Sequence, residues 1–227
     1  MGAASAMEST APKAGEKNDG QTRMANSRRI KLNFEIKDVG PSGLAGVDLW
    51  ITSNGKAWKK LEAPVQAEPY VLEVDEDGKY GFTLIARNGL GQSQPAPVAG
   101  DQPQTWVIVD TKQPEARWLE ATAIKNGQGH QVDLAWKVDD TNLGSRPVTL
   151  HYAESEQGPW KMMGLDFEAQ GRHTWQAPQG LRKLHVKLEA RDQAGNVITS
   201  IWPQPLFVAE STPSIKIVQV EAKGPDR

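Results

Sequence analysis

The chain has 227 residues, enough for one large domain or two ordinary domains that each bury a hydrophobic core. Its 26 basic and 28 acidic residues are well mixed and give a formal net charge of −2, which argues against nucleic acid or an anionic membrane as a partner. The mean hydropathy is −0.56, no apolar run approaches the ~18 residues of a membrane span, and the absence of cysteine excludes disulfides, thiolate zinc sites and cysteine nucleophiles.

Residues 1–27 carry no apolar periodicity and are rich in Ala, Gly, Ser, Glu and Lys. Such a segment cannot bury enough apolar surface to offset its ordering entropy, so we expect a disordered N-terminal tail. The segment also lacks the apolar stretch of a signal peptide.

Strand structure is expected from Ile30 onward, because apolar and polar side chains alternate strictly between Ile30 and Ile36. The same pattern returns between Val132 and Val138, at an offset of 102 (36 to 138). Further stretches recur in the same order at similar offsets: Val47, Leu49 and Ile51 with Val148, Leu150 and Tyr152; Trp58 with Trp160; and Tyr80, Phe82, Leu84 and Ala86 with Leu184, Val186, Leu188 and Ala190. The offset changes only between strands, where loops lie, which indicates a tandem domain duplication.

Turn signals interrupt the chain about every 8–12 residues, and no convincing helical stretch lies between them. Asn54-Gly55 and Asn126-Gly127 favour type I′ hairpin turns, in which both central residues have positive φ. This spacing predicts an all-β fold of two immunoglobulin-like sandwiches, with residues 28–111 forming the first and residues 112–209 the second.

The stretch Tyr80-x-Phe82-x-Leu84-x-Ala86-x-Asn88-x-x-Gly91 resembles the sixth strand and following loop of fibronectin type III domains. In that family the tyrosine makes a corner hydrogen bond at the start of the strand, and Leu184 takes its place in the second copy. Trp136 ends a second-strand pattern as the family's tryptophan does, with Phe34 in its place in the first copy. The resemblance covers roughly residues 28–209 and implies a fold rather than a function.

The linker "VDTKQPEARW" resembles the Asp-Thr-x-x-Pro joints of bacterial tandem immunoglobulin-like arrays. It is short, and Pro114 fixes its own φ and favours an extended preceding residue. We therefore expect the two sandwiches to be arranged end to end.

No common catalytic or nucleotide-binding motif is present, so we do not expect an enzyme. The four histidines are scattered one per segment, which argues against a histidine metal site: His130, His151, His173 and His185.

Trp50 falls out of step with Val47, Leu49 and Ile51, so we expect its indole to point outward, where it could stack on a sugar ring or anchor a protein. The alternative is a half-buried indole that a neighbouring strand covers. Trp118 and Trp175 are weaker candidates for the same carbohydrate-binding surface.

Calcium is the one cofactor that the sequence suggests. The loops and the linker at the expected domain joint hold six candidate aspartates: Asp75, Asp77, Asp110, Asp139, Asp140 and Asp192. The alternative is a set of solvated acidic loops, which the interleaved Lys79, Lys112 and Lys137 favour.

The second copy opens with a strand-like segment, "ARWLEATAI", whereas no such segment is visible before Ile30 in the first copy. Residues 210–227 contain "PSIKIVQVEA", which aligns with "PEARWLEATA" at an offset of 99 (Pro114 to Pro213) and resembles the first strand of a further domain. Exchange of this strand between molecules would follow from an unpaired sheet edge. The alternatives are a chain cut from a longer array, or an edge that Met24–Ser27 or the tail itself covers.

These features lead us to expect a non-enzymatic scaffold, spacer or adhesive repeat of a bacterial surface or envelope protein. We expect an extracytoplasmic location, with protein partners or self-association. The alternative functions are a carbohydrate-binding accessory module that recognises a glycan, and a strand-exchanging self-assembly subunit.

Overall fold

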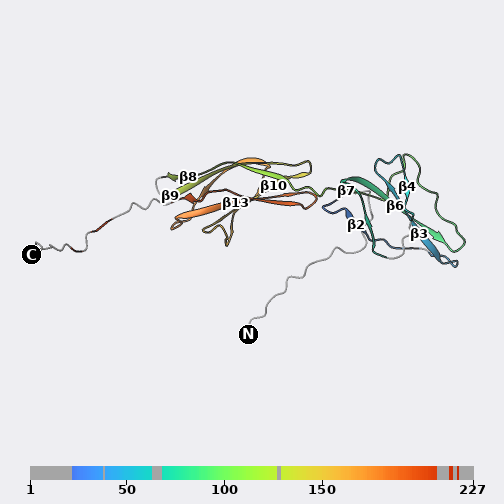
Figure 1. The fold of residues 1–227 in the computed structure, drawn as a ribbon. Coiled ribbons are helices and arrows are strands. Elements are labelled where there is room, and N and C mark those ends of the chain that lie inside the picture. The colour runs from blue at the N-terminus through green and yellow to red at the C-terminus, as the bar shows by residue number, and fades with distance from the viewer. Residues whose placement is uncertain are drawn as a thin grey trace, which may run out of the picture. The chain divides into compact units, whose positions relative to one another are not determined.

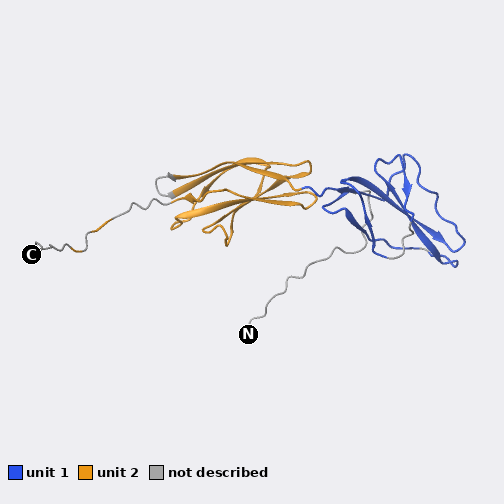
Figure 2. Ribbon diagram, in the orientation of Figure 1, with its two compact units in different colours: residues 1–112 blue, residues 113–227 orange. Residues whose placement is uncertain are grey.

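The computed structural model divides the chain into two compact units, unit 1 (residues 1–112) and unit 2 (residues 113–227) (Figure 2). It describes residues 22–37, 39–62, 68–126, 129–208, 215, 216 and 219. Every element among these residues is a β-strand, so the predicted all-β sandwich fold is confirmed (Figure 1). The described residues include no helix with the length and apolar character needed to span a membrane. The end-to-end arrangement stays a prediction.

Unit 1 is built from two sheets. The five-stranded sheet has the order β1 (Thr22–Ala25), β7 (Thr105–Val109), β6 (Gly78–Asn88), β3 (Leu44–Thr52) and β4 (Lys59–Lys60). The two-stranded sheet consists of β2 (Arg29–Leu32) and β5 (Tyr70–Glu73). Apolar side chains from both sheets form the core: Ile30, Val47, Leu49, Leu72, Val74, Phe82, Val107 and Val109.

Strand β1 corrects two expectations from the sequence. The sequence predicts a disordered tail that includes residues 22–25 and no first strand in the first copy. In the structure β1 pairs in parallel with β7, from Thr22 opposite Trp106 to Ala25 opposite Val109. The amide of Asp110 extends this pairing by donating to the carbonyl of Ala25 at 2.9 Å. The sequence "TRMA" has no apolar alternation, so this strand depends on the backbone of its neighbour and not on a pattern of its own.

Strand β2 is shorter than its sequence pattern predicted. The alternation runs from Ile30 to Ile36, but the strand ends at Leu32. Within the described residues β2 has only β5 as a neighbour, whereas its counterpart in unit 2, β9 (Gly129–Asp139), is paired on both sides. A strand with one ladder has half of its backbone groups unpaired by the sheet, which accounts for its early end.

Unit 2 has the more complete sandwich. One sheet has the order β11 (Lys161–Phe167), β10 (Leu143–Ala153), β13 (Lys183–Asp192) and β14 (Val197–Ile201), and β15 (Leu206–Phe207) also pairs with β13. The other sheet has the order β12 (Gln170–Gln176), β9 and β8 (Glu115–Asn126). The two sheets enclose a core in which the largest buried side chains are Trp136, Leu134, Leu150, Leu184 and Leu188.

The Asn54-Gly55 turn is not the predicted type I′ turn. Gly55 has a φ of 71°, but Asn54 is not among the residues with positive φ. Side chains organise this turn instead: Thr52 Oγ1 accepts a hydrogen bond from the amide of Gly55, and Asn54 Oδ1 accepts bonds from the amides of Lys56 and Ala57. Such local bonds from Asn and Thr side chains are an alternative to a paired backbone turn. The other predicted turn lies partly outside the described residues, since β8 ends at Asn126 and β9 begins at Gly129.

The corner hydrogen bond predicted for the first copy is confirmed. The hydroxyl of Tyr80 donates to the carbonyl of Glu76 at 2.8 Å, across the turn that leads into β6. In unit 2 the equivalent Leu184 is fully buried and packs in the core. The same position therefore closes a turn in one unit and fills the interior in the other.

Candidate functional site

Two of the three candidate tryptophans are part of the core packing of unit 2. The indole N–H of Trp118 donates to the carbonyl of Ser200 at 3.2 Å, and its ring meets the ring of Trp202 edge-on at 6.4 Å between centroids. The ring of Trp175 lies 4.6 Å from that of Tyr152. Both indoles are half-buried and pack against the buried core.

Trp50 is half-buried on β3 of unit 1. The strand places it opposite Thr83 of β6 on one side and Lys60 of β4 on the other. This is the environment expected for an indole that neighbouring strands cover, although part of the ring remains exposed. Glycan binding through Trp50 stays a prediction.

Asp77 and Asp75, two of the six candidate calcium ligands, lie in a hydrogen-bonded structure at one end of unit 1. Asp77 accepts hydrogen bonds from the amide and the hydroxyl of Thr111 at 3.0 and 2.9 Å, and from Arg28 Nε at 2.9 Å. Arg28 Nη1 also donates to the carbonyl of Asp75 at 3.0 Å. The backbone hydrogen bond from Thr111 and the bond from Arg28 hold the pKa of Asp77 below its ordinary value. We call Arg28, Asp77 and Thr111 the linker clamp.

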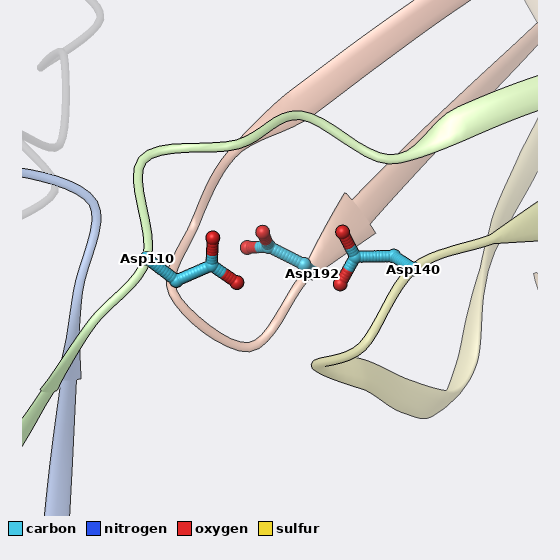
Figure 3. Close-up of side chains that lie close together, drawn as sticks. All are labelled: Asp110, Asp140 and Asp192. Carbon is cyan, nitrogen blue, oxygen red and sulfur yellow. The ribbon is translucent and has the colours of Figure 1, made fainter. Parts of the chain in front are cut away.

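The remaining candidate aspartates fall into two groups. Asp139 forms surface ion pairs with Lys137 at 2.8 Å and with Arg117 at 3.8 Å. Asp110, Asp140 and Asp192 come together: each offers one carboxylate oxygen, and these oxygens lie within 4.8 Å of one another (Figure 3). Asp110 follows β7, Asp140 follows β9, and Asp192 ends β13.

Each of these three carboxylates also binds the backbone of its own loop. Asp110 accepts a hydrogen bond from the amide of Lys112 at 3.1 Å, and Asp140 accepts one from the amide of Asn142 at 2.6 Å. Asp192 accepts bonds from the amides of Gly195 and Asn196 at 2.7 and 2.8 Å, and its other oxygen accepts from the Asn196 side chain. These hydrogen bonds stabilise the loops, so each of the three aspartates has a structural role in its turn.

Hard carboxylate oxygens are the ligands that Ca²⁺ prefers, but it takes six to eight of them. In the part of the chain that the structure describes, these three aspartates are the one group of potential metal ligands brought together. Calcium binding therefore stays a prediction, and of its six candidate aspartates the described structure brings together Asp110, Asp140 and Asp192.

The four histidines lie on different strands of unit 2. Burial lowers the pKa of His173, and burial followed by the nearby charge of Lys187 lowers the pKa of His151. The ring of His173 lies 4.8 Å from that of Phe167. The ring contact with Phe167 assigns the imidazole of His173 to packing.

A buried charged group that the sequence did not reveal lies on β3. The carboxylate of Asp48 accepts two hydrogen bonds from Arg87, at 3.1 and 3.2 Å, and pairs with Lys60 at 2.8 Å. Asp48 is only 7% exposed, although it stands at the polar position of an alternating strand. The alternating pattern predicts which face of the sheet Asp48 occupies. It does not predict that Arg87 of β6 and Lys60 of β4 cover the carboxylate on that face.

No sequence profile of a known family and no curated protein sequence matches this chain. Among solved structures it is similar to the chicken CNTN1 FN1-FN3 domains, with 13% identity and a TM-score of 0.43 over 80% of this chain and 65% of that chain. It is also similar to the chicken interferon gamma receptor alpha chain (12% identity, TM-score 0.31, 82% of this chain and 94% of that chain). A third is a tetra-tandem repeat from the extending region of a large adhesion protein (17% identity, TM-score 0.28, 74% of this chain and 43% of that chain).

Proposed function

We propose that this chain is a non-enzymatic structural and interaction module of a bacterial surface or envelope protein, acting outside the cytoplasm as a spacer, scaffold or adhesive repeat. The observation that carries this proposal is the linker clamp. Asp77 binds both the amide and the hydroxyl of Thr111, the second residue of the Asp-Thr pair in the linker.

The clamp gives the linker motif a physical role. The carboxylate of Asp77 accepts hydrogen bonds from the hydroxyl and the amide of Thr111, and it also accepts one from Arg28. The amide of the next residue, Lys112, donates to Asp110. A connection whose first residues are bonded to the preceding sandwich suits a protein whose modules are joined in series. It supports a role in spacing and presentation.

Protease treatment of intact source cells tests this proposal. A tagged full-length protein should be cleaved by an added protease that does not enter the cell, while a cytoplasmic marker stays intact. Fractionation should place the chain with the envelope or the medium. Recovery of the uncleaved chain with the cytoplasmic marker would overturn the proposal.

The second candidate function is glycan binding, which the partly exposed ring of Trp50 favours. A glycan array followed by affinity electrophoresis tests it, because Trp50→Ala should lose retention on any bound glycan. Trp160→Ala is the matched control: Trp160 lies in unit 2 under the ammonium group of Lys187, 5.1 Å from its ring centroid. Retention by the Trp50→Ala variant, or no retention by the wild-type chain, would remove this candidate.

A further inference from the structure

Among the described residues, one edge of strand β2 in unit 1 has no partner strand, and we call it the open edge. The amide of Val74 donates to the carbonyl of Arg28 at 3.0 Å, so the alternation of an antiparallel ladder turns the backbone groups of Ile30 and Leu32 toward β5. The backbone groups of Arg29 and Lys31 then face the other way, where the amide of Arg29 donates to Ser27 Oγ at 3.1 Å. No strand within the described ranges pairs with that side of β2.

Unit 2 shows which strand belongs at this position. Its strand β9 is the counterpart of β2, and β9 pairs with β8 from Asp139 opposite Glu115 to Gly129 opposite Asn126. In unit 1 the first strand, β1, pairs with β7 of the other sheet instead. The place that β8 fills in unit 2 is therefore not filled in unit 1 by any strand that the structure describes.

Space for side chains lies along the open edge. A hollow of about 240 Å³ is lined by Ile30, Lys31, Leu32 and Asn33 together with residues of β1 and β7. A second hollow, of about 170 Å³, borders the chain from Phe34 to Lys37 and is also lined by Val47 of β3 and by Leu84 and Ala86 of β6. Ile36, which the alternation assigns to the core, is 40% exposed. Among the described residues, the apolar cover of this edge therefore decreases from Ile30, which is buried in the core, to Ile36.

Residues 214–222 have the side-chain pattern of β8. Strand β8 turns Ala116, Trp118, Ala121 and Ala123 inward, and the irregularity between Trp118 and Glu120 leaves Leu119 outside, 58% exposed. At the offset of 99 the four inward positions become Ile215, Ile217, Val220 and Ala222, which are all apolar. Val218 falls on the irregularity. The segment therefore matches both the alternation of β8 and the point at which that alternation shifts.

We propose that residues 214–222 of one copy of this chain add as an antiparallel strand to the open edge of β2 in a second copy. This inference rests on the proposed function and names the partner of the interaction module. Unit 2 cannot accept the segment at β9, because β8 already occupies that edge. Backbone hydrogen bonds to an exposed edge give such contacts affinity, and alternate side chains in pockets give them specificity.

The register of β8 on β9 specifies the register of the added strand. Transferred to unit 1, it places Ala222 opposite Ile30, Val220 opposite Leu32 and Ile217 opposite Phe34.

On the outer face the same register places Glu221 opposite Lys31 and Lys216 opposite Glu35. Opposite charges directly across a strand pair are favourable. The two charge pairs are an independent match between the segment and the edge.

Cross-linking between two different variants tests the register. The chain has no cysteine, so Lys31→Cys and Glu221→Cys each introduce a single thiol. After the two purified full-length variants are mixed and mildly oxidised, we expect a disulfide-linked heterodimer. Glu73→Cys replaces Lys31→Cys in the control mixture, because Glu73 is exposed on β5 of the same sheet but away from the open edge. Equal yields from the two mixtures would overturn the register.

Sizing tests the association itself. A tail-to-edge contact is heterologous, so a bound pair still offers a free tail and a free edge, and the light-scattering mass of the wild-type chain should rise with concentration. A chain ending at Val208 should remain monomeric. Ile217→Asp should also be monomeric, because it places a charge at an inward position, whereas its neighbour Val218→Asp should still associate.

Two results would contradict the proposal. A wild-type chain that stays monomeric at every concentration, with no heterodimer from the mixed variants, rules it out. A fast-migrating monomer from the double variant Lys31→Cys/Glu221→Cys, with no product from the mixed single variants, shows that the segment binds its own chain and not a second copy. Neither result bears on the surface location, which protease treatment of intact cells tests separately.

Discussion

Single polar side chains close the turns of both units. Thr52 and Asn54 bind four backbone amides around one turn, and Asp192 binds two in another. The hydroxyl of Tyr80 stabilises the turn that leads into β6 by donating a hydrogen bond to the carbonyl of Glu76. Because these groups replace backbone pairing, the removal of one atom from them has a local and measurable effect on stability.

The corner bond of Tyr80 gives the first prediction. Tyr80→Phe removes the hydroxyl that donates to Glu76 but keeps the ring, which stacks on Phe82 at 6.5 Å. The free energy of unfolding of unit 1 should fall by about 1 kcal/mol, the usual contribution of one hydrogen bond. Urea unfolding followed by hydrogen-exchange mass spectrometry measures the change in each unit. An unchanged unit 1 would show that the corner bond does not stabilise it.

The ion pairs of Asp48 give the second prediction. Burial raises the pKa of Asp48, but the hydrogen bonds and charges of Lys60 and Arg87 outweigh it, so the pKa lies below its ordinary value of 3.8. A lowered folded-state pKa contributes stability that is present above pH 3.8 and is lost as the pH falls through the folded-state pKa. Asp48→Asn should therefore destabilise unit 1 at neutral pH, and the difference from wild type should shrink below pH 3.8.

The expected loss at neutral pH is about 1–2 kcal/mol, because Lys60 and Arg87 are themselves partly exposed and solvent screens the pairs. Glu73→Gln is the control, since Glu73 is exposed on β5 of the same unit. Urea unfolding over a range of pH measures both variants. A constant difference between Asp48→Asn and wild type across that range would contradict the assignment.

The sixth strands of the two units, β6 and β13, have the same sequence pattern but different burial. Leu188 on β13 is completely buried among the side chains of unit 2. Its counterpart Leu84 on β6 is only half-buried and borders the hollow beside Phe34. The difference follows from the neighbouring sheet, which among the described residues has three strands in unit 2 and two in unit 1.

This difference gives the third prediction. Leu188→Ala should lower the free energy of unfolding of unit 2 by about 2–5 kcal/mol, because it leaves a cavity in a closed core. Leu84→Ala should lower that of unit 1 by only about 1–2 kcal/mol, since part of the side chain is already exposed. Leu119→Ala on the outer face of β8 is the control and should change stability by less than about 0.5 kcal/mol. Equal losses at Leu84 and Leu188, measured by urea unfolding, would contradict the prediction.

The sequence predicted the strands that have their own alternating pattern, and the structure confirms them: β3, β6, β8, β9, β10 and β13. It did not predict β1, whose four residues have no pattern and form a strand only through the backbone of β7. It also extended β2 to Ile36, because alternation reports the preference of a segment and not the number of its neighbours. Both errors concern pairing between distant segments.

The candidate site divides in the same way. The sequence identified the three aspartates that come together, because loops at one pole of a sandwich are fixed by its topology. It could not show that Trp118 and Trp175 pack inward, since the partners that cover them, Trp202 and Tyr152, come from other strands. Asp77 was chosen for its charge, but its partners Arg28 and Thr111 are distant in sequence.

At the scale of the whole molecule, the segment from Asp110 to Pro114 joins unit 1 to unit 2. Its first residues are bonded within unit 1, through the clamp and through Asp110. Loop segments without such bonds are the usual sites of proteolytic cleavage. The clamp should therefore protect a linker that contains a cleavable lysine.

Trypsin cleavage after Lys112 measures this protection, which is the fourth prediction. Asp77→Ala removes the acceptor for both bonds of Thr111, so cleavage at Lys112 should become several-fold faster than in wild type under native conditions. Asp75→Ala is the matched control, because Asp75 contributes its carbonyl and not its carboxylate to the clamp. Equal rates for the Asp77→Ala variant and the wild-type chain would show that the clamp does not restrain the linker.

Calcium binding is the fifth prediction and is measured on the full chain. If Asp110, Asp140 and Asp192 hold Ca²⁺, the thermal midpoint should rise with millimolar Ca²⁺ relative to EDTA, because a ligand that binds the folded state stabilises it. Asp140→Asn should abolish the rise while keeping an acceptor for the amide of Asn142. Asp139→Asn, next in the chain, should not. Identical midpoints in Ca²⁺ and EDTA would end the calcium hypothesis.

The parallel pairing of β1 with β7 has a mechanical consequence. The chain enters this pair at Thr22 and leaves it at Val109, which lie at opposite ends of the same ladder. Tension that pulls these two points apart slides one strand along the other, so all the bonds of the ladder are strained together and not one after another. The hydrogen bonds between β1 and β7 are thus loaded in shear, so unit 1 should resist a stretching force until these bonds break together in a single step.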